Sequence, residues 1–107
     1  MRDLKTNLNL LIEAAEKTRE LADSADKICA ALANCIRGGG TIFTCGNGGS
    51  AADAMHFAEE LTGKYKAVRR PLRGICINSD AAALTCIAND FGYESVFSRP
   101  VSYTHLR

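Results

Sequence analysis

The sequence predicts an α/β fold in which two helices precede an alternation of strands and helices. Apolar side chains recur at helical spacing through the first 37 residues. Two short β-branched runs, 41–45 and 73–77, then alternate with helical segments that begin at Ala51 and Ala81. Strand, helix, strand, helix in this order is typical of right-handed βαβ crossovers in a doubly wound parallel sheet.

Each of the two N-terminal helices has its own signals. The first is amphipathic, and the second is expected to begin near Ser24 as N-cap, with Asp26 in its first turn, and to end at the glycines from Gly38 onward. The apolar stripe of the first helix contains Leu4, Leu8, Leu11, Ala15 and Ala22, widened by Ile12, while Glu13, Glu16, Lys17 and Glu20 fall on the opposite side.

The strands and later helices are bounded by turn and cap residues. Thr41–Cys45 is β-branched, aromatic and flanked by glycines, which favours a strand buried on both faces, and Arg73–Ile77 is expected to be the second strand. Between them, the helix that ends at Gly63 is expected to place one face inward, formed by Ala51, Met55, Ala58 and Thr62. The last helix, Ala81–Ala88, would be started by Ser79 or Asp80.

Composition excludes several classes of partner. Thirteen basic against twelve acidic residues give a net charge of +1, so bulk charge predicts neither nucleic-acid nor membrane-surface binding. The basic stretch Lys64–Arg73 is interrupted by apolar residues and is expected to be a solvated loop. Neither a signal peptide nor a membrane span is expected. Five cysteines without a Cys-x-x-Cys pair indicate reduced core thiols in a cytoplasmic protein.

The segment Gly46–Ser50 lies between a predicted strand and a predicted helix and favours an anion-binding loop. Glycines let the backbone approach a ligand, and the first amides of the helix point outward. The structural alternative is a tight turn in which Ser50 caps the helix and Asp53 completes a capping box. A dinucleotide pattern is also satisfied, but two helices precede this strand and no acidic residue follows at the required distance, so a sugar phosphate is favoured.

Two side chains on the next helix could share one ligand. His56 and Glu60 are four residues apart, so they lie one above the other on a helix and could hold a metal or a substrate. The alternative is a surface ion pair of little energetic weight. Glu59 is expected to point elsewhere. The segment from Asn89 to Gly92, taken alone, is an ordinary helix C-terminus followed by a turn.

Three segments together resemble phosphoheptose isomerases, of the sugar isomerase (SIS) domain superfamily. They are Cys45–Ser50, Ala54–Gly63 and Ile87–Gly92, in family order and at family-like spacing. The resemblance covers residues 1–99, which would be the N-terminal part of a single SIS domain, and 100–107 does not resemble the family. It implies a three-layer α/β/α flavodoxin-like fold with a parallel sheet, and a homotetramer with active sites at subunit interfaces.

The resemblance also implies a reaction and a set of site residues. The reaction would interconvert sedoheptulose 7-phosphate and D-glycero-D-manno-heptose 7-phosphate through an enediol, supplying heptose for surface polysaccharide such as lipopolysaccharide. His56 and Glu60 would be zinc ligands and catalytic groups, with Glu60 also contacting the substrate. The remaining substrate-binding residues would be Asn47, Gly48, Gly49, Ser50, Asn89 and Asp90.

Some features depart from the family pattern. Lys64 stands where the family often has Arg, and the family's second phosphate loop and the C-terminal helix that supplies a Gln and a His are not matched. Because two strands do not make a self-sufficient parallel sheet, we expect a truncated domain that is inactive and self-associating alone. The alternative function is a non-catalytic SIS protein that binds a phosphosugar or associates with the replication initiator.

Overall fold

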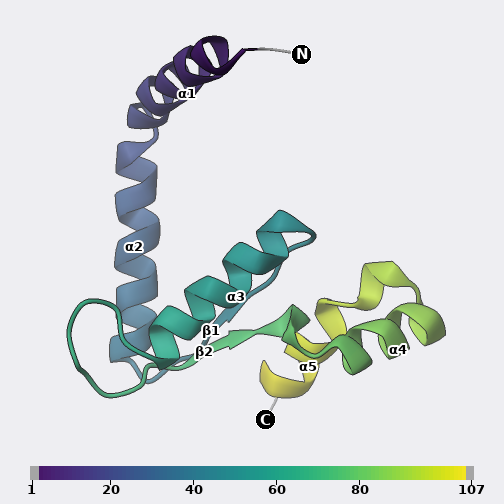
Figure 1. Ribbon diagram of the computed structural model, residues 1–107. Coiled ribbons are helices and arrows are strands. Elements are labelled where there is room, and N and C mark those ends of the chain that lie inside the picture. Colours follow the sequence, from purple (N-terminus) through teal and green to yellow (C-terminus); the bar gives the residue numbers. More distant parts are fainter. Residues whose placement is uncertain (1–2, 106–107) are drawn as a thin grey trace. The chain divides into compact units, whose positions relative to one another are not determined.

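The computed structural model describes residues 3–105, with side chains through Tyr103. Its contacts divide the chain into two compact units, residues 1–34 and 35–107 (Figure 1). The order of elements confirms the predicted alternation, because two helices come first and two parallel strands follow, joined by a helix. Every helix within the described range is too short or too polar to cross a lipid bilayer.

Helices α1 (Leu4–Arg19) and α2 (Ala22–Arg37) follow each other with only a tight turn between them. The Asp3 carboxylate caps α1 by accepting from the Thr6 amide at 2.7 Å, which lowers the Asp3 pKa. The predicted N-cap of α2, Ser24, is wrong by three residues, because the helix already begins at Ala22. The Leu21 carbonyl already accepts from the Ala25 amide at 2.9 Å, so the helix begins directly after the turn.

The apolar stripe predicted for the first helix is largely uncovered. No described side chain of α1 or α2 is buried, and Leu4 is 73% exposed and Leu11 64% exposed. An amphipathic helix with an exposed apolar face has a surface available for association with another apolar surface.

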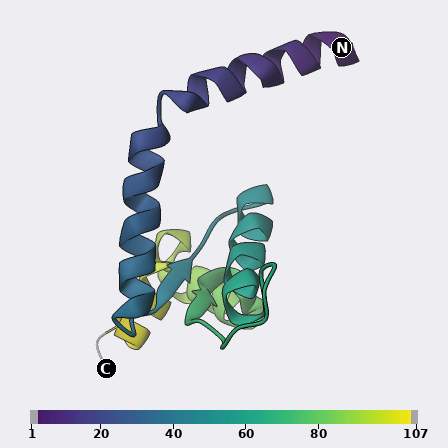
Figure 2. The ribbon, with the colours of Figure 1, turned by 90° about the vertical axis from the view of Figure 1, so that its left-hand side faces the viewer.

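The second unit is built around strands β1 (Ile42–Thr44) and β2 (Gly74–Cys76), which pair in parallel with Ile42 opposite Gly74. Both strands are shorter than predicted, and β1 is only partly buried, since Ile42 is buried while the other two residues are half-buried. Helix α3 (Gly49–Thr62) connects them and lies along the pair (Figures 1 and 2).

The face of α3 that packs on the sheet agrees with the predicted one at Ala58 but not at Met55. Ala54 and Ala58 are buried and form a small core with Cys76 of β2, whereas Met55 is 44% exposed. A side chain added at Gly74 would lie 2.8 Å from the Leu61 side chain, so glycine there permits the close approach of α3. The Thr44 hydroxyl also donates to the Ala54 carbonyl at 2.7 Å.

Four short elements complete the unit. After β2 come a 3₁₀ turn η1 (Ile77–Ser79), helix α4 (Ala81–Phe91), a second 3₁₀ turn η2 (Tyr93–Ser95) and helix α5 (Ser98–His105). Asp80, one of the two predicted caps, starts α4 by accepting from the Ala83 amide at 3.0 Å. Helix α5 includes part of the segment 100–107, so this segment continues the helical structure up to His105.

The prediction that the cysteines are core thiols is wrong for three of the five. Cys76 is buried and Cys35 half-buried, but Cys29, Cys45 and Cys86 are exposed. All five are free. The error arises because a cysteine with apolar neighbours in sequence is buried only where another element packs over it, and few of the described elements pack against one another.

Candidate functional site

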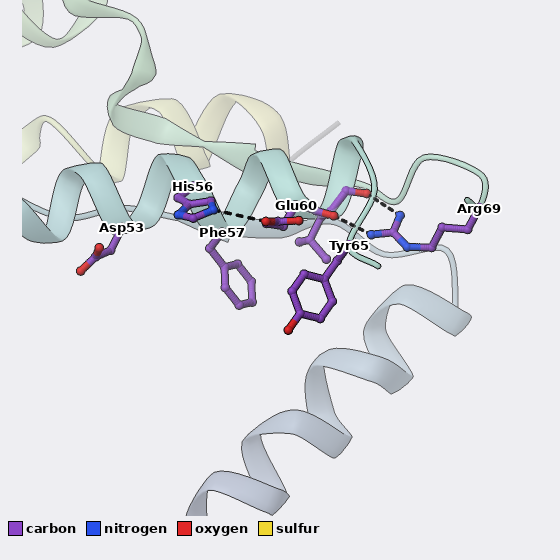
Figure 3. A pocket seen from close by; sticks show the side chains of 7 residues that line it. Asp53, His56, Phe57, Glu60, Tyr65 and Arg69 are labelled. Carbon is purple, nitrogen blue, oxygen red and sulfur yellow. Dashed lines mark hydrogen bonds and ion pairs between the residues drawn. The ribbon is translucent and has the colours of Figure 1, made fainter. Parts of the chain in front are cut away.

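A pocket of about 530 Å³ opens along the outer side of α3 and the loop that follows it (Figure 3). Its lining combines acidic, basic and imidazole groups with two aromatic rings. This mixture suits a ligand that carries polar groups on a carbon chain. The lining residues are Asp53, His56, Phe57, Glu60, Leu61, Tyr65 and Arg69.

The structure brings His56 and Glu60 together as the sequence predicts. The His56 Nε2 atom lies 3.2 Å from the Glu60 Oε1 atom, and the two side chains are 70% and 32% exposed. Helical spacing of four residues places one above the other, and Figure 3 shows the two groups facing each other along the helix. The half-buried carboxylate of Glu60 is therefore held beside an imidazole at the pocket wall.

The expectation that Glu59 points elsewhere is wrong. The donor atoms of His56, Glu59 and Glu60 all lie within 4.8 Å of one another. The spacing of three residues between His56 and Glu59 also brings side chains to one side of a helix, and the exposed Glu59 is free to rotate toward its neighbours. One imidazole nitrogen and two carboxylates are a donor set that zinc accepts, so these residues fit a zinc ion.

Arg69 holds the end of α3 in place. Its guanidinium donates to the Glu60 carbonyl at 2.5 Å and to the Leu61 carbonyl at 2.9 Å, two groups that have no partner within the helix. A cation at a helix C-terminus also interacts favourably with the helix dipole. The basic loop is mostly exposed as predicted, but Arg69 is a half-buried exception with a structural task.

The glycine loop, residues 46–50, leads into α3 without the predicted cap. The N-cap is Gly48, with φ +56°, and no side chain caps the helix, so the Ser50–Asp53 capping box is absent. A positive φ at Gly48 turns the chain early, and Ser50 consequently lies inside the first helical turn. In the described part of the chain, nothing accepts from the amides of Gly49 and Ser50, which leaves two donors for an anion.

Two side chains from later segments hold the glycine loop. The Gly46 amide donates to the Asn78 side-chain oxygen at 3.0 Å, and the Tyr93 hydroxyl donates to the Asn47 side-chain oxygen. A Cβ at Gly46 would lie 2.4 Å from the Ser50 carbonyl oxygen, so the tight course of the loop requires glycine there. These contacts together give the loop one defined course.

Asn89 and Asp90 lie in the last turn of α4, as an ordinary helix C-terminus would place them. The Asn89 amide donates to Asp90 at 3.0 Å, and the Cys86 thiol donates to the other Asp90 oxygen at 3.4 Å. This hydrogen bond, together with the carboxylate charge, raises the pKa of the Cys86 thiol. Neither Asn89 nor Asp90 lines the pocket beside His56, and neither do residues of the glycine loop.

Sequence reasoning missed several residues that shape the site. Phe57 and Tyr65 contribute rings to the pocket, Arg69 fixes the end of α3, and Tyr93 reaches the glycine loop over 46 positions of chain. The three-residue spacing of Phe57 and Glu60 along the helix could have indicated Phe57, but no local pattern indicates the other contacts. Figure 3 shows Phe57 and Tyr65 extending in the same direction from the backbone.

Comparisons with known proteins agree on one family. The SIS domain family profile matches residues 6–104. A phosphoheptose isomerase of Campylobacter concisus is 48% identical over 100 residues, covering 90% of this chain and 53% of the relative. One from Helicobacter hepaticus is 47% identical over 98 residues, covering 92% of this chain and 50% of the relative. The chain thus spans about half the length of the curated relatives it matches.

Solved structures give the same result. The phosphoheptose isomerase of Neisseria gonorrhoeae superposes with a TM-score of 0.84 at 35% identity, covering 94% of this chain and 52% of that structure. The enzyme of Francisella tularensis gives a TM-score of 0.79 at 27% identity, covering 94% of this chain and 55% of that structure. These matches confirm both the predicted resemblance and the α/β fold class. The chain belongs to the SIS domain family.

Proposed function

We propose that this chain forms the part of a ketose–aldose isomerase that carries its anion loop and its catalytic carboxylate. The substrate pair would be sedoheptulose 7-phosphate and D-glycero-D-manno-heptose 7-phosphate, in heptose biosynthesis. The observation that carries the proposal is the half-buried Glu60 carboxylate beside His56 in a pocket, on the same helix whose first turn offers two free amides. The names of the relatives support the substrate class.

The residues can be given roles in this chemistry. Isomerisation moves a proton between adjacent carbons through an enediol, and Glu60 is suited to accept and return that proton. The free amides of Gly49 and Ser50 would bind the phosphate, and the Ser50 hydroxyl would support them. Asn47, Gly48, Asn89 and Asp90 would contact the sugar.

Zinc would be held by His56 and Glu60, with Glu59 as a third donor in this chain. When bound, zinc supplies a Lewis acid that polarises a carbonyl oxygen. A calorimetric zinc titration of the chain tests the ligand set. We expect Glu60→Gln and His56→Ala each to weaken zinc binding about tenfold or more, with Glu16→Gln on α1 as control; equal affinities throughout would exclude this site.

A second copy of the chain would be needed to complete the site. Ser50 and Glu60 are ten residues apart, a rise of about 15 Å along α3. The Glu60 side chain leans toward the N-terminus of α3 and shortens this gap, but no residue of the glycine loop lines the His56 pocket. We propose a homotetramer in which the glycine loop of one subunit lies near the His56 pocket of another. The exposed apolar face of α1 would contribute to assembly.

The catalytic test needs the second half of the domain. A chimera joins residues 1–99 of this chain to the remaining part of the Campylobacter concisus relative, and conversion of sedoheptulose 7-phosphate is measured with added zinc. Loss of the general base in Glu60→Gln is expected to reduce the rate about 10²–10⁴-fold, whereas Glu16→Gln leaves it unchanged. Sugar-phosphate binding without turnover in the unmutated chimera would favour the non-catalytic alternative.

A further inference from the structure

The glycine loop is tied to the segment after α4 through one side-chain contact. The Tyr93 hydroxyl donates to the side-chain oxygen of Asn47, linking residues that are 46 positions apart in sequence. Asn47 is itself exposed at the mouth of the loop, and its carbonyl accepts from the Ala51 amide at 3.3 Å. The backbone of Asn47 is therefore fixed by the start of α3, and its side chain is fixed by Tyr93.

The backbone at Tyr93 is placed by a glycine turn and by the buried Val96, while the Tyr93 side chain itself is exposed. Gly92 ends α4 with φ +88°, a conformation that side-chain-bearing residues rarely adopt, and this turn directs the chain into η2. The Val96 amide then donates to the Tyr93 carbonyl at 3.1 Å, and Val96 is only 2% exposed. The phenol thus projects from a turn that is anchored by the most buried of the core residues found in the described chain.

The contact determines what Asn47 can offer a ligand. A primary amide has an accepting oxygen at one end and two N–H donors at the other. With Oδ1 occupied by the Tyr93 hydroxyl, the Nδ2 group is directed away from Tyr93, and no described residue accepts from it. Asn47 therefore presents donors, which suit phosphate, hydroxyl and carbonyl oxygens.

We propose that Tyr93 is a positioning residue that fixes the Asn47 amide with its donors toward a sugar-phosphate oxygen. The ligand class rests on the proposed function, but the orientation of the amide rests on the hydrogen bond alone. A side chain ordered before binding loses less conformational entropy when the ligand arrives. The hydroxyl of Tyr93 thereby strengthens binding without touching the substrate.

The first test needs no ligand. Tyr93→Phe removes only the hydroxyl, and ¹⁵N relaxation of the Asn47 side-chain amide is measured in the 107-residue chain. We expect the amide to be more ordered than that of the exposed Asn7 in the unmutated chain, and to become equally mobile in Tyr93→Phe. An Asn47 amide whose order is the same with and without the hydroxyl overturns the proposal.

The second test measures binding in the chimera described above. Tyr93→Phe is expected to raise KM for sedoheptulose 7-phosphate about threefold to tenfold with kcat nearly unchanged, because one hydrogen bond supports ground-state binding. Tyr93→Phe combined with Asn47→Ala should be no worse than Asn47→Ala alone, and additive losses would overturn the positioning role. If the amide loses order in Tyr93→Phe while no sugar phosphate binds, the positioning stands and the proposed function fails.

Discussion

Replacing Arg69 by Ala should loosen the C-terminal turn of α3 by a predictable amount. The guanidinium donates to the Glu60 and Leu61 carbonyls, and hydrogen bonds to charged groups contribute about 1.5–3 kcal/mol each. The Leu61 carbonyl retains a second donor, the Leu72 amide at 2.9 Å, and water can reach the half-buried Glu60. The expected local loss is therefore about 2 kcal/mol, near the contribution of a single such bond.

Hydrogen exchange at single amides measures this loss. A local destabilisation of about 2 kcal/mol should accelerate exchange about 30-fold at the amides of Gly63 and Leu72, which bond to the same helix end. The exchange rates in Arg69→Lys should lie between those of the unmutated chain and of Arg69→Ala, because lysine retains the positive charge but lacks the planar guanidinium group. The neighbouring Arg70 is exposed and serves as the matched control. If these amides exchange at the same rate in Arg69→Ala and in Arg70→Ala, the Arg69 side chain does not stabilise the end of the helix.

Three further changes test other features. Gly46→Ala should disorder the glycine loop and abolish phosphate binding, because the added Cβ would lie 2.4 Å from a backbone oxygen. Binding of inorganic phosphate is measured by calorimetry, and an affinity equal to that of the unmutated chain would contradict this. Asp90→Asn should lower the raised pKa of the Cys86 thiol, so that more thiolate forms near pH 8 and alkylation becomes faster. The alkylation rate is followed by mass spectrometry, and an unchanged rate would rule out Asp90 as the cause of the raised pKa. Leu11→Glu should reduce self-association in light scattering, and persistence of the same oligomer would exclude the α1 face from assembly.

The elements that depend on local pattern were predictable, and those that depend on distant contacts were not. Helical periodicity indicated α1 to α4, and the spacing of four residues correctly brought His56 and Glu60 together. The start of α3 was misplaced because a preference for Ser50 as a cap was outweighed by the backbone turn at Gly48.

Contacts across the loops have no counterpart in the sequence pattern. Arg69 looks like any other residue of a basic loop, and only the folded chain brings its guanidinium to the end of α3. Tyr93 similarly lies in a turn with no periodic signal. The position of Glu59 was also missed, because only the spacing of four residues was considered, although side chains three residues apart are helical neighbours as well.

The bond between the Thr44 hydroxyl and the Ala54 carbonyl has a mechanical consequence. It fastens the end of β1 to the second turn of α3, so the two elements that flank the glycine loop are linked directly to each other. A hinge motion of the helix away from the strand would have to break this bond at 2.7 Å. An adjustment of the loop that keeps this bond intact takes place by rotation of individual peptide planes, which Gly48 and Gly49 allow.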